Sequence, residues 1–109
     1  MYDKIYYPYP STDTTTKYFI ITDTGRKVKF GRKGYEDFTI HKDEERKMRY
    51  INRHQKRENW TKSGINTAGF WSFKLLWSYP SKEEAYEKIK KDLLKWGIIT
   101  KEQYNHYVF

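Results

Sequence analysis

Residues 17–31, KYFIITDTGRKVKFG, decide the fold expected for this chain. The run at 17–22 is rich in β-branched and aromatic residues, which is typical of a strand. Residues 27–31 alternate polar and apolar side chains, as a half-buried strand does. Asp23-Thr-Gly25 separates the two runs with turn-forming residues. The stretch therefore predicts a β-hairpin.

The segments that follow predict one more strand and then helices. Residues 37–41, DFTIH, alternate again, with Phe38 and Ile40 on one face, and predict a third strand. Asp43 is a suitable N-cap for a helix that we expect to run to about residue 58 or 59. Three further helical segments are expected: a buried one over 70–78, one over 81–96 opened by a capping box and ended by Gly97, and a last short turn from Thr100.

These elements predict an α+β fold. We expect a small antiparallel sheet of about three strands followed by three to four helices, in a single compact domain spanning residues 17–109. Residues 1–16 lack a helical or strand period and are predicted to form an N-terminal arm. This arm is rich in tyrosine, proline and threonine, and we expect its aromatic rings to dock on a protein partner. The candidate contact residues of the arm are Tyr2, Tyr6, Tyr7 and Tyr9.

Composition excludes several classes of site. The chain has no cysteine, which excludes disulfides and cysteine-based zinc sites. It has no apolar run long enough to cross a membrane, and its first residues do not resemble a signal peptide. We therefore expect a protein that is not secreted and has no membrane partner. Of the net charge of +8, residues 26–57 account for most, with twelve Lys and Arg against five Asp and Glu, a local +7.

The strongest functional signal is the segment 41–60, HKDEERKMRYINRHQKRENW. On a helix its basic residues share one face, while Met48 and Ile51 point the opposite way, toward the core. No acid interrupts the segment between Arg46 and Arg57, which favours a contact face over a solvated one with alternating charges. The predicted anion-binding residues are Lys42, Arg46, Arg49, Arg53 and Arg57 on the helix, extended on the hairpin by Lys29, Arg32 and Lys33.

Catalysis and metal binding are not expected. The one cluster with acid–base or metal potential consists of His41, Asp43, His54, Glu58 and Asn59. His54 and Glu58, four residues apart, share a helix face. No nucleophile or recognised catalytic motif completes the set, so a structural role is the simpler interpretation. We therefore expect a non-enzymatic protein without cofactor or metal. The glycosylation sequon at Asn59 is taken as accidental in a chain without a secretory route.

Several short sequence motifs, in a fixed order along the chain, resemble those of a known protein family. They are FG at 30–31, DFTIHKD at 37–43, RYINRH at 49–54, RENW at 57–60, TAG at 67–69 and LLW at 75–77. Over roughly residues 17–80 the chain resembles a family of small uncharacterised proteins encoded by large nucleocytoplasmic DNA viruses. The resemblance implies a viral origin, a compact domain and a location in the virion or in the viral factory of the host cytoplasm. It transfers no catalytic residue.

Two functions remain open at this stage. The first is binding of nucleic acid without sequence specificity, in which the arginine helix lies along phosphates and Tyr50 stacks or hydrogen-bonds beside it. The second is a minor capsid or virion structural protein, in which the basic face and the aromatic termini bind acidic neighbouring capsid proteins. The sequence does not distinguish the anionic partner or give the oligomeric state.

Overall fold

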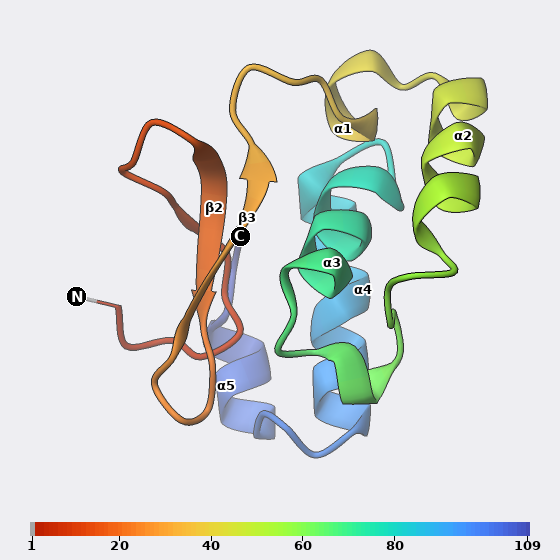
Figure 1. Ribbon diagram of the computed structural model, residues 1–109. Helices are drawn as coiled ribbons and strands as arrows, with labels where there is room; N and C mark the ends of the chain where they lie inside the picture. Colours follow the sequence, from red (N-terminus) through yellow and green to blue (C-terminus); the bar gives the residue numbers. More distant parts are fainter. Residues whose placement is uncertain (1) are drawn as a thin grey trace.

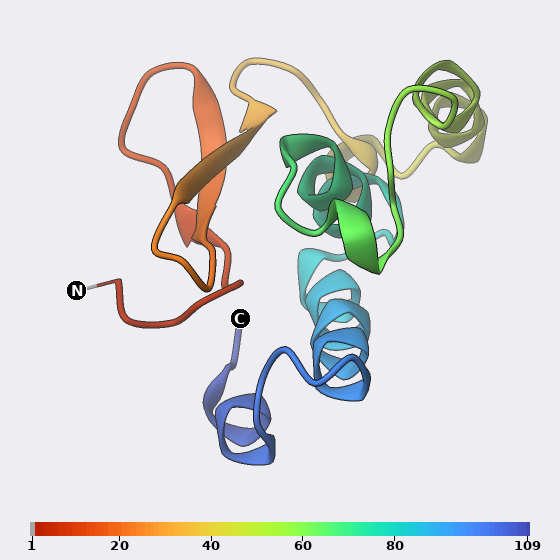
Figure 2. The ribbon, with the colours of Figure 1, turned by 60° about the horizontal axis from the view of Figure 1, so that its bottom comes forward.

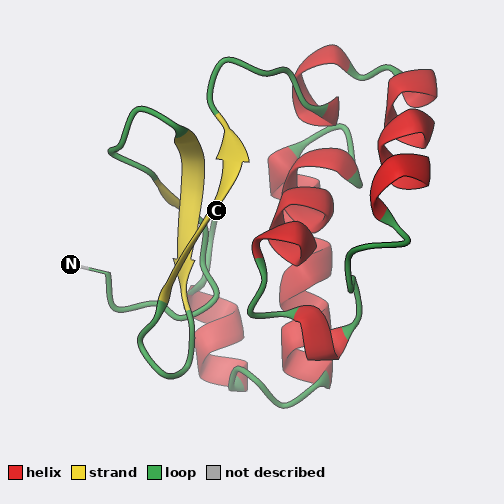
Figure 3. Ribbon diagram, in the orientation of Figure 1, coloured by secondary structure: helices red, strands yellow, loops and turns green. Residues whose placement is uncertain are grey.

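A small antiparallel sheet lies on one side of the molecule, and the helices lie on the other (Figures 1 and 3). The computed structural model describes residues 2–109. This arrangement confirms the predicted α+β fold with a small sheet. In chain order the elements are β1 Tyr9–Pro10, β2 Thr16–Ile21, β3 Lys27–Arg32, α1 Phe38–His41, α2 Glu44–His54, the 3₁₀ turn Lys62–Gly64, α3 Ala68–Trp71, the π-helical turn Ser72–Trp77, α4 Lys82–Lys95 and α5 Lys101–His106.

The predicted hairpin is confirmed as β2 and β3. Ile20 pairs with Val28 and Tyr18 with Phe30, and the turn between the strands contains Gly25 with a positive φ of 87°. Ile20, Val28 and Phe30 are buried against the helices. The hairpin forms locally because the apolar residues alternate at the strand period and the turn contains a residue that tolerates positive φ.

The third strand is not the predicted one. Residues 37–41 do not form a strand; Phe38–His41 form the one-turn helix α1. Asp37 is its N-cap and accepts a hydrogen bond from the backbone N–H of Thr39 at 3.0 Å. Phe38 is buried, whereas Ile40 is 54% exposed. An apolar–polar alternation over only five residues is equally compatible with one helical turn, and here the N-cap decides between them.

The third strand comes instead from the segment predicted to be an arm. Tyr9 and Pro10 form β1 and pair with Phe19 and Tyr18 of β2. Tyr6 is 2% exposed, and its backbone carbonyl accepts a hydrogen bond from the Tyr86 hydroxyl at 2.9 Å. For the described residues 2–16, the prediction of a separate arm is therefore wrong, because this segment is part of the domain.

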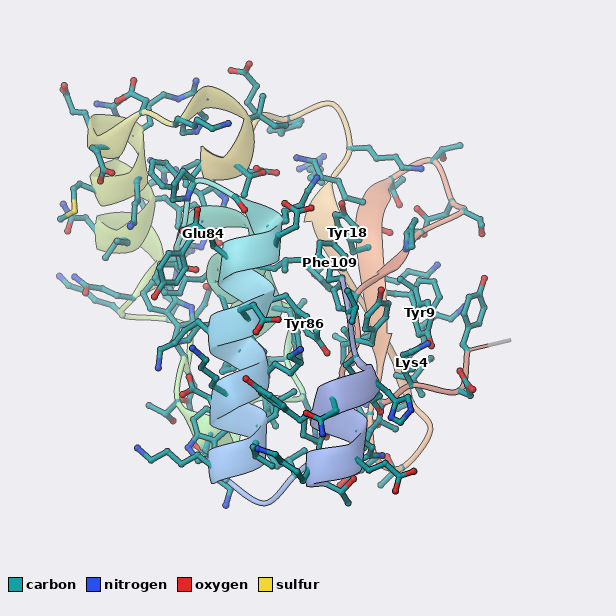
Figure 4. The ribbon with its side chains drawn as sticks, turned by 180° about the vertical axis from the view of Figure 1, so that it is seen from behind. Lys4, Tyr9, Tyr18, Glu84, Tyr86 and Phe109 are labelled. Atoms are coloured by element: carbon teal, nitrogen blue, oxygen red, sulfur yellow. The ribbon has the colours of Figure 1, made fainter. Side chains whose placement is uncertain are left out.

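Residues 5–7 and the C-terminal residues 107–109 lie against each other on the sheet side of α4. The Tyr7 hydroxyl donates to the carbonyl of Val108 at 2.8 Å, and the backbone N–H of Ile5 donates to the Tyr107 hydroxyl at 3.2 Å. Phe109 lies among the rings of Tyr7, Tyr18 and Tyr86, with centroid distances near 6 Å (Figure 4). The aromatic residues of the two termini thus form part of the core and its edge.

The helices stack outward from the sheet. The segment formed by α3 and the π-helical turn packs on β3, and α4 packs on the same segment. Helix α2 lies farthest from the strands in both views (Figures 1 and 2). The predicted buried helix over 70–78 and the predicted helix over 81–96 are both confirmed, with Ser81 accepting from the backbone N–H of Glu84 at the start of α4.

Helix α2 differs from its prediction in length and in orientation. It ends at His54, not at 58 or 59. Met48, predicted to face the core, is 52% exposed, whereas Tyr50 is 7% exposed. The helix is anchored by this tyrosine, whose ring stacks at 4.2 Å on Trp77 of the π-helical turn. An aromatic ring buries more area than a methionine at this position and decides which side of the helix faces inward.

Candidate nucleic-acid interface and adjoining pocket

The predicted basic stripe is only partly formed. Arg46, Arg49 and Arg53 lie on α2, but Lys42 is the C-cap of α1 with a φ of 54°, and Arg57 lies in the turn after α2. A single helical face with five basic residues therefore does not exist. The prediction placed the basic residues of 42–57 on one helix wheel, but the left-handed backbone at Lys42 precedes α2 and the helix ends at His54, before Arg57.

Two of the three arginines on α2 are already paired with acids. Arg46 lies 3.0 Å from Glu36, and Arg49 lies 3.2 Å from Glu45. The absence of acids between Arg46 and Arg57 in the sequence predicted a stripe without counterions, and this prediction is wrong for Arg46 and Arg49. Glu36 reaches Arg46 from the segment before α1, which is a contact between elements that helical spacing does not reveal.

Three arginines of the predicted anion-binding set have no such partner. Among the described residues, no carboxylate lies within ion-pair distance of Arg32, Arg53 or Arg57. We call these three residues the free-arginine set. On the hairpin, by contrast, Lys29 pairs with Asp13 at 2.9 Å, and the Lys33 ammonium donates to the backbone carbonyl of Asp13.

A pocket of about 470 Å³ lies beside the free-arginine set. Its wall is formed by the end of β3, the start of α1, the inner side of α2, and α3 with the π-helical turn. Arg32 and Arg53 both line it, although they are 21 positions apart in the sequence. The remaining lining residues are Lys17, Phe30, Gly31, Tyr35, Glu36, Asp37, Tyr50, His54, Glu58, Ala68, Gly69, Ser72, Leu76 and Trp77.

Every carboxylate on the pocket wall has a counterpart of its own. Asp37 is 3% exposed and lies 2.6 Å from the Lys17 ammonium, while Glu36 pairs with Arg46. Glu58 lies 2.7 Å from Nδ1 of His54. The guanidinium groups of Arg32 and Arg53 are the cations of the pocket wall without an ion-pair partner among the described residues, and such groups favour anions.

A stack of rings forms the side of the pocket at α2. The Tyr50 ring lies between His54 at 4.1 Å and Trp77 at 4.2 Å, in nearly parallel planes. Burial raises the pKa of the Tyr50 hydroxyl to about 12. The prediction that Tyr50 stacks on bases is wrong, because both faces of its ring are covered by protein.

The predicted neighbourhood of His54 and Glu58 is confirmed, but His41 lies apart from it. Glu58 also accepts a hydrogen bond from Nε1 of Trp60 at 3.0 Å. His41 does not line the pocket; its Nδ1 accepts from the backbone N–H of Asp43 at 3.0 Å. Across residues 2–109 there is no group of three or more His, Asp or Glu side chains placed to hold a metal ion.

The tyrosines predicted to contact a partner lie at different depths. Tyr6 is buried, and Tyr7 and Tyr9 are half-buried and pack on one another at 5.0 Å. Tyr2 is the most exposed of the four, at 48%, and its ring lies edge-on to Phe19 at 4.9 Å. The prediction fails for Tyr6, which has no surface to offer a partner.

Comparison with known proteins adds one match. Residues 9–54 match the model of a family described as a family of unknown function (DUF5754). The matched region runs from β1 to the end of α2 and contains Arg32 and Arg53. No curated protein and no solved structure matches the chain. Within residues 2–109, no helix combines the length and apolar character needed to span a membrane.

Several pocket residues were missed by sequence reasoning. Lys17 and Asp37 were assigned to strands, and their ion pair depends on α1 replacing the third strand. Two glycines mark places where chain segments approach closely. In the structure, a Cβ at Gly31 would lie 2.8 Å from Leu76, and one at Gly69 would lie 2.9 Å from the carboxyl carbon of Glu58. A glycine at such a position allows close approach of another chain segment, but the sequence alone does not say of which.

Proposed function

We propose that this protein is a non-enzymatic nucleic-acid-binding protein that contacts phosphates without sequence specificity. One observation carries the proposal: Arg32, Arg53 and Arg57 have no carboxylate within ion-pair distance among the described residues, whereas Arg46, Arg49 and Lys29 do. Arginines without an internal partner are available to bind phosphate oxygens.

The charge of the whole chain supports the same function. A net charge of +8 on 109 residues attracts polyanions over the distance of the Debye length and speeds encounter with them. The guanidinium group forms two parallel hydrogen bonds with a phosphate, which positions the backbone without reading bases. Given the resemblance to small proteins of large DNA viruses, the setting we propose is the virion or the viral factory.

The alternative function is that of a minor capsid or virion structural protein. Binding of capsid neighbours through the aromatic residues of the two termini loses support. Tyr6 and Tyr107 are buried, and Phe109 packs within the domain. Another observation favours a protein contact of a different kind: Ile40 and Met48 are both more than half exposed. A capsid neighbour would then contact α1 and α2 through these side chains.

The salt dependence of DNA binding separates the two functions. Binding to random duplex DNA is measured across salt for the intact protein, for Arg53→Ala/Arg57→Ala and for Arg46→Ala/Arg49→Ala, which removes the same charge from paired arginines. The slope of log affinity against log salt should fall by about 2 units in the first variant and by less than 1 in the second. Equal losses would assign binding to overall charge alone. No binding at low salt would reject the proposal and leave the capsid alternative.

A further inference from the structure

We infer that the pocket beside the free-arginine set binds a single nucleotide through its phosphate monoester. The inference deepens the proposed function and rests on it, since Arg53 belongs to both the polymer-binding surface and the pocket wall. At about 470 Å³ the pocket falls in the size range of sites that enclose small molecules. It is therefore suited to one nucleotide and not to a duplex.

The charges of the wall select an anion. The three carboxylates that line the pocket are each held by a cation or a ring N–H of the protein, at 2.6–3.0 Å. Two guanidinium groups without an ion-pair partner in residues 2–109 remain, those of Arg32 on β3 and Arg53 on α2, and they outnumber the one carboxylate, Glu58, that is held by ring nitrogens and not by a lysine or arginine. Two guanidinium groups match the charge of a phosphate monoester, which carries close to two negative charges near neutral pH, and both can bind its oxygens bidentately.

The rim of the pocket offers a surface for a planar ring. Tyr35 is 62% exposed, and the Arg32 guanidinium lies 5.0 Å from the centre of its ring. Arg32 lies over one face of this exposed ring, and an unpaired base would stack on the other face, as bases do on exposed aromatic side chains. The Lys17 ammonium donates to the backbone carbonyl of Tyr35 at 2.6 Å and so fixes the chain between β3 and α1. This contact holds the Tyr35 ring close to Arg32.

The rigid parts of the wall indicate a preformed site. Asp37 accepts hydrogen bonds from the backbone N–H and the hydroxyl of Thr39 in addition to its ion pair with Lys17. Glu58 is held from two sides by His54 and Trp60. A wall fixed by hydrogen bonds loses little conformational entropy when a ligand enters, which favours binding.

Calorimetric titration with adenosine 5′-monophosphate tests the inference. We expect the nucleotide to bind with one-to-one stoichiometry and adenosine, which lacks the phosphate, to bind at least tenfold more weakly. Arg32→Gln and Arg53→Gln should each lower the affinity for the nucleotide at least tenfold. Arg49→Gln, which changes a paired arginine of the same helix, is the matched control and should change the affinity less than twofold. Tyr35→Ala should lower the affinity for the nucleotide but leave the affinity for inorganic phosphate unchanged.

Two results would overturn the inference. One is the absence of nucleotide binding at millimolar concentration, and the other is an equal loss of affinity in Arg49→Gln and Arg53→Gln. A comparison of 5′-phosphorylated and 5′-hydroxyl oligonucleotides then distinguishes a strand end from a free nucleotide as the source of the phosphate. If duplex DNA binds with the expected salt slope and the nucleotide does not bind, the inference fails and the proposed function stands. If the nucleotide binds and DNA does not, the pocket is a nucleotide site and the proposed function fails.

Discussion

The guanidinium group of Arg46 lies 3.0 Å from the carboxylate of Glu36, ten positions earlier in the chain. The pair ties α2 to the segment before α1, and it removes Arg46 from the charges available to a ligand. Both side chains are more than a third exposed, so the pair contributes little to stability. The pair matters because it neutralises Arg46 and leaves Arg53 as the arginine of α2 without an ion-pair partner among the described residues.

Substitution of Glu36 should therefore increase the affinity for DNA. Glu36→Gln releases Arg46, and we expect the slope of log affinity against log salt to rise by up to about 1 unit. Glu102→Gln is the matched control, because it removes an exposed acid of α5 that forms no ion pair among the described residues. If both variants raise the slope equally, net charge and not the release of Arg46 is the cause.

A side chain at residue 69 should disturb the pocket. The Cβ of Gly69→Ala would lie 2.9 Å from the Glu58 carboxyl carbon, so the Glu58 side chain, which is hydrogen-bonded to His54, must shift. Because a flexible side chain can shift at small cost and Ala is favoured over Gly in a helix, we expect a net change of no more than about 1 kcal/mol in the free energy of unfolding. Urea denaturation of Gly69→Ala, Glu58→Ala and the double variant measures the coupling between the two positions. Additive losses would show that the two residues do not interact.

The N-terminal segment should contribute to the stability of the domain. Tyr86→Phe removes the hydrogen bond to the buried carbonyl of Tyr6, and we expect a loss of about 1–3 kcal/mol, since that carbonyl is left without its partner. The control is Tyr104→Phe, whose hydroxyl forms no hydrogen bond among residues 2–109. Comparable losses in thermal or urea unfolding for the two variants would contradict this role of Tyr6.

Alkaline pH should destabilise the protein through Tyr50. Burial holds the pKa of its hydroxyl at about 12 in the folded state, against about 10 when unfolded. The unfolded state loses the proton first, so this contribution is fully present below pH 10 and is lost as the pH rises toward 12. Between pH 9 and pH 11 we expect a loss of about 1 kcal/mol from Tyr50. Urea unfolding at both values should show a smaller loss for Tyr50→Phe. An unchanged pH dependence in that variant would contradict the raised pKa.

Local signals in the sequence were sufficient for the hairpin and for α4. The β2–β3 hairpin combines strand-period alternation with a glycine turn, and α4 combines a serine N-cap, a buried stripe and Gly97 in the left-handed region. In both cases the information lies within about fifteen residues. Such elements are predictable because propensity, hydrophobic pattern and capping all favour the same structure.

The errors have a common physical origin in tertiary contacts. Ile40 looked like a core residue of a strand, but Asp37 caps a helix there and is held by Lys17 of β2. Tyr50, not Met48, faces inward because Trp77 lies in position to stack on it. The same holds for the candidate site: the sequence identified Arg32 and Arg53, but their position at one pocket depends on how α2 packs on the π-helical turn through Tyr50 and Trp77.

Chemical-shift mapping by NMR tests the central claim most directly. A 5′-phosphorylated single-stranded oligonucleotide is added to isotope-labelled protein, and the shifts of the arginine side chains and the backbone amides are followed. We predict the largest changes at Arg32, Tyr35, Arg53 and Arg57, with small changes at the paired Arg46 and Arg49. Changes centred on the exposed Ile40 and Met48, or spread evenly over all basic residues, would contradict the account.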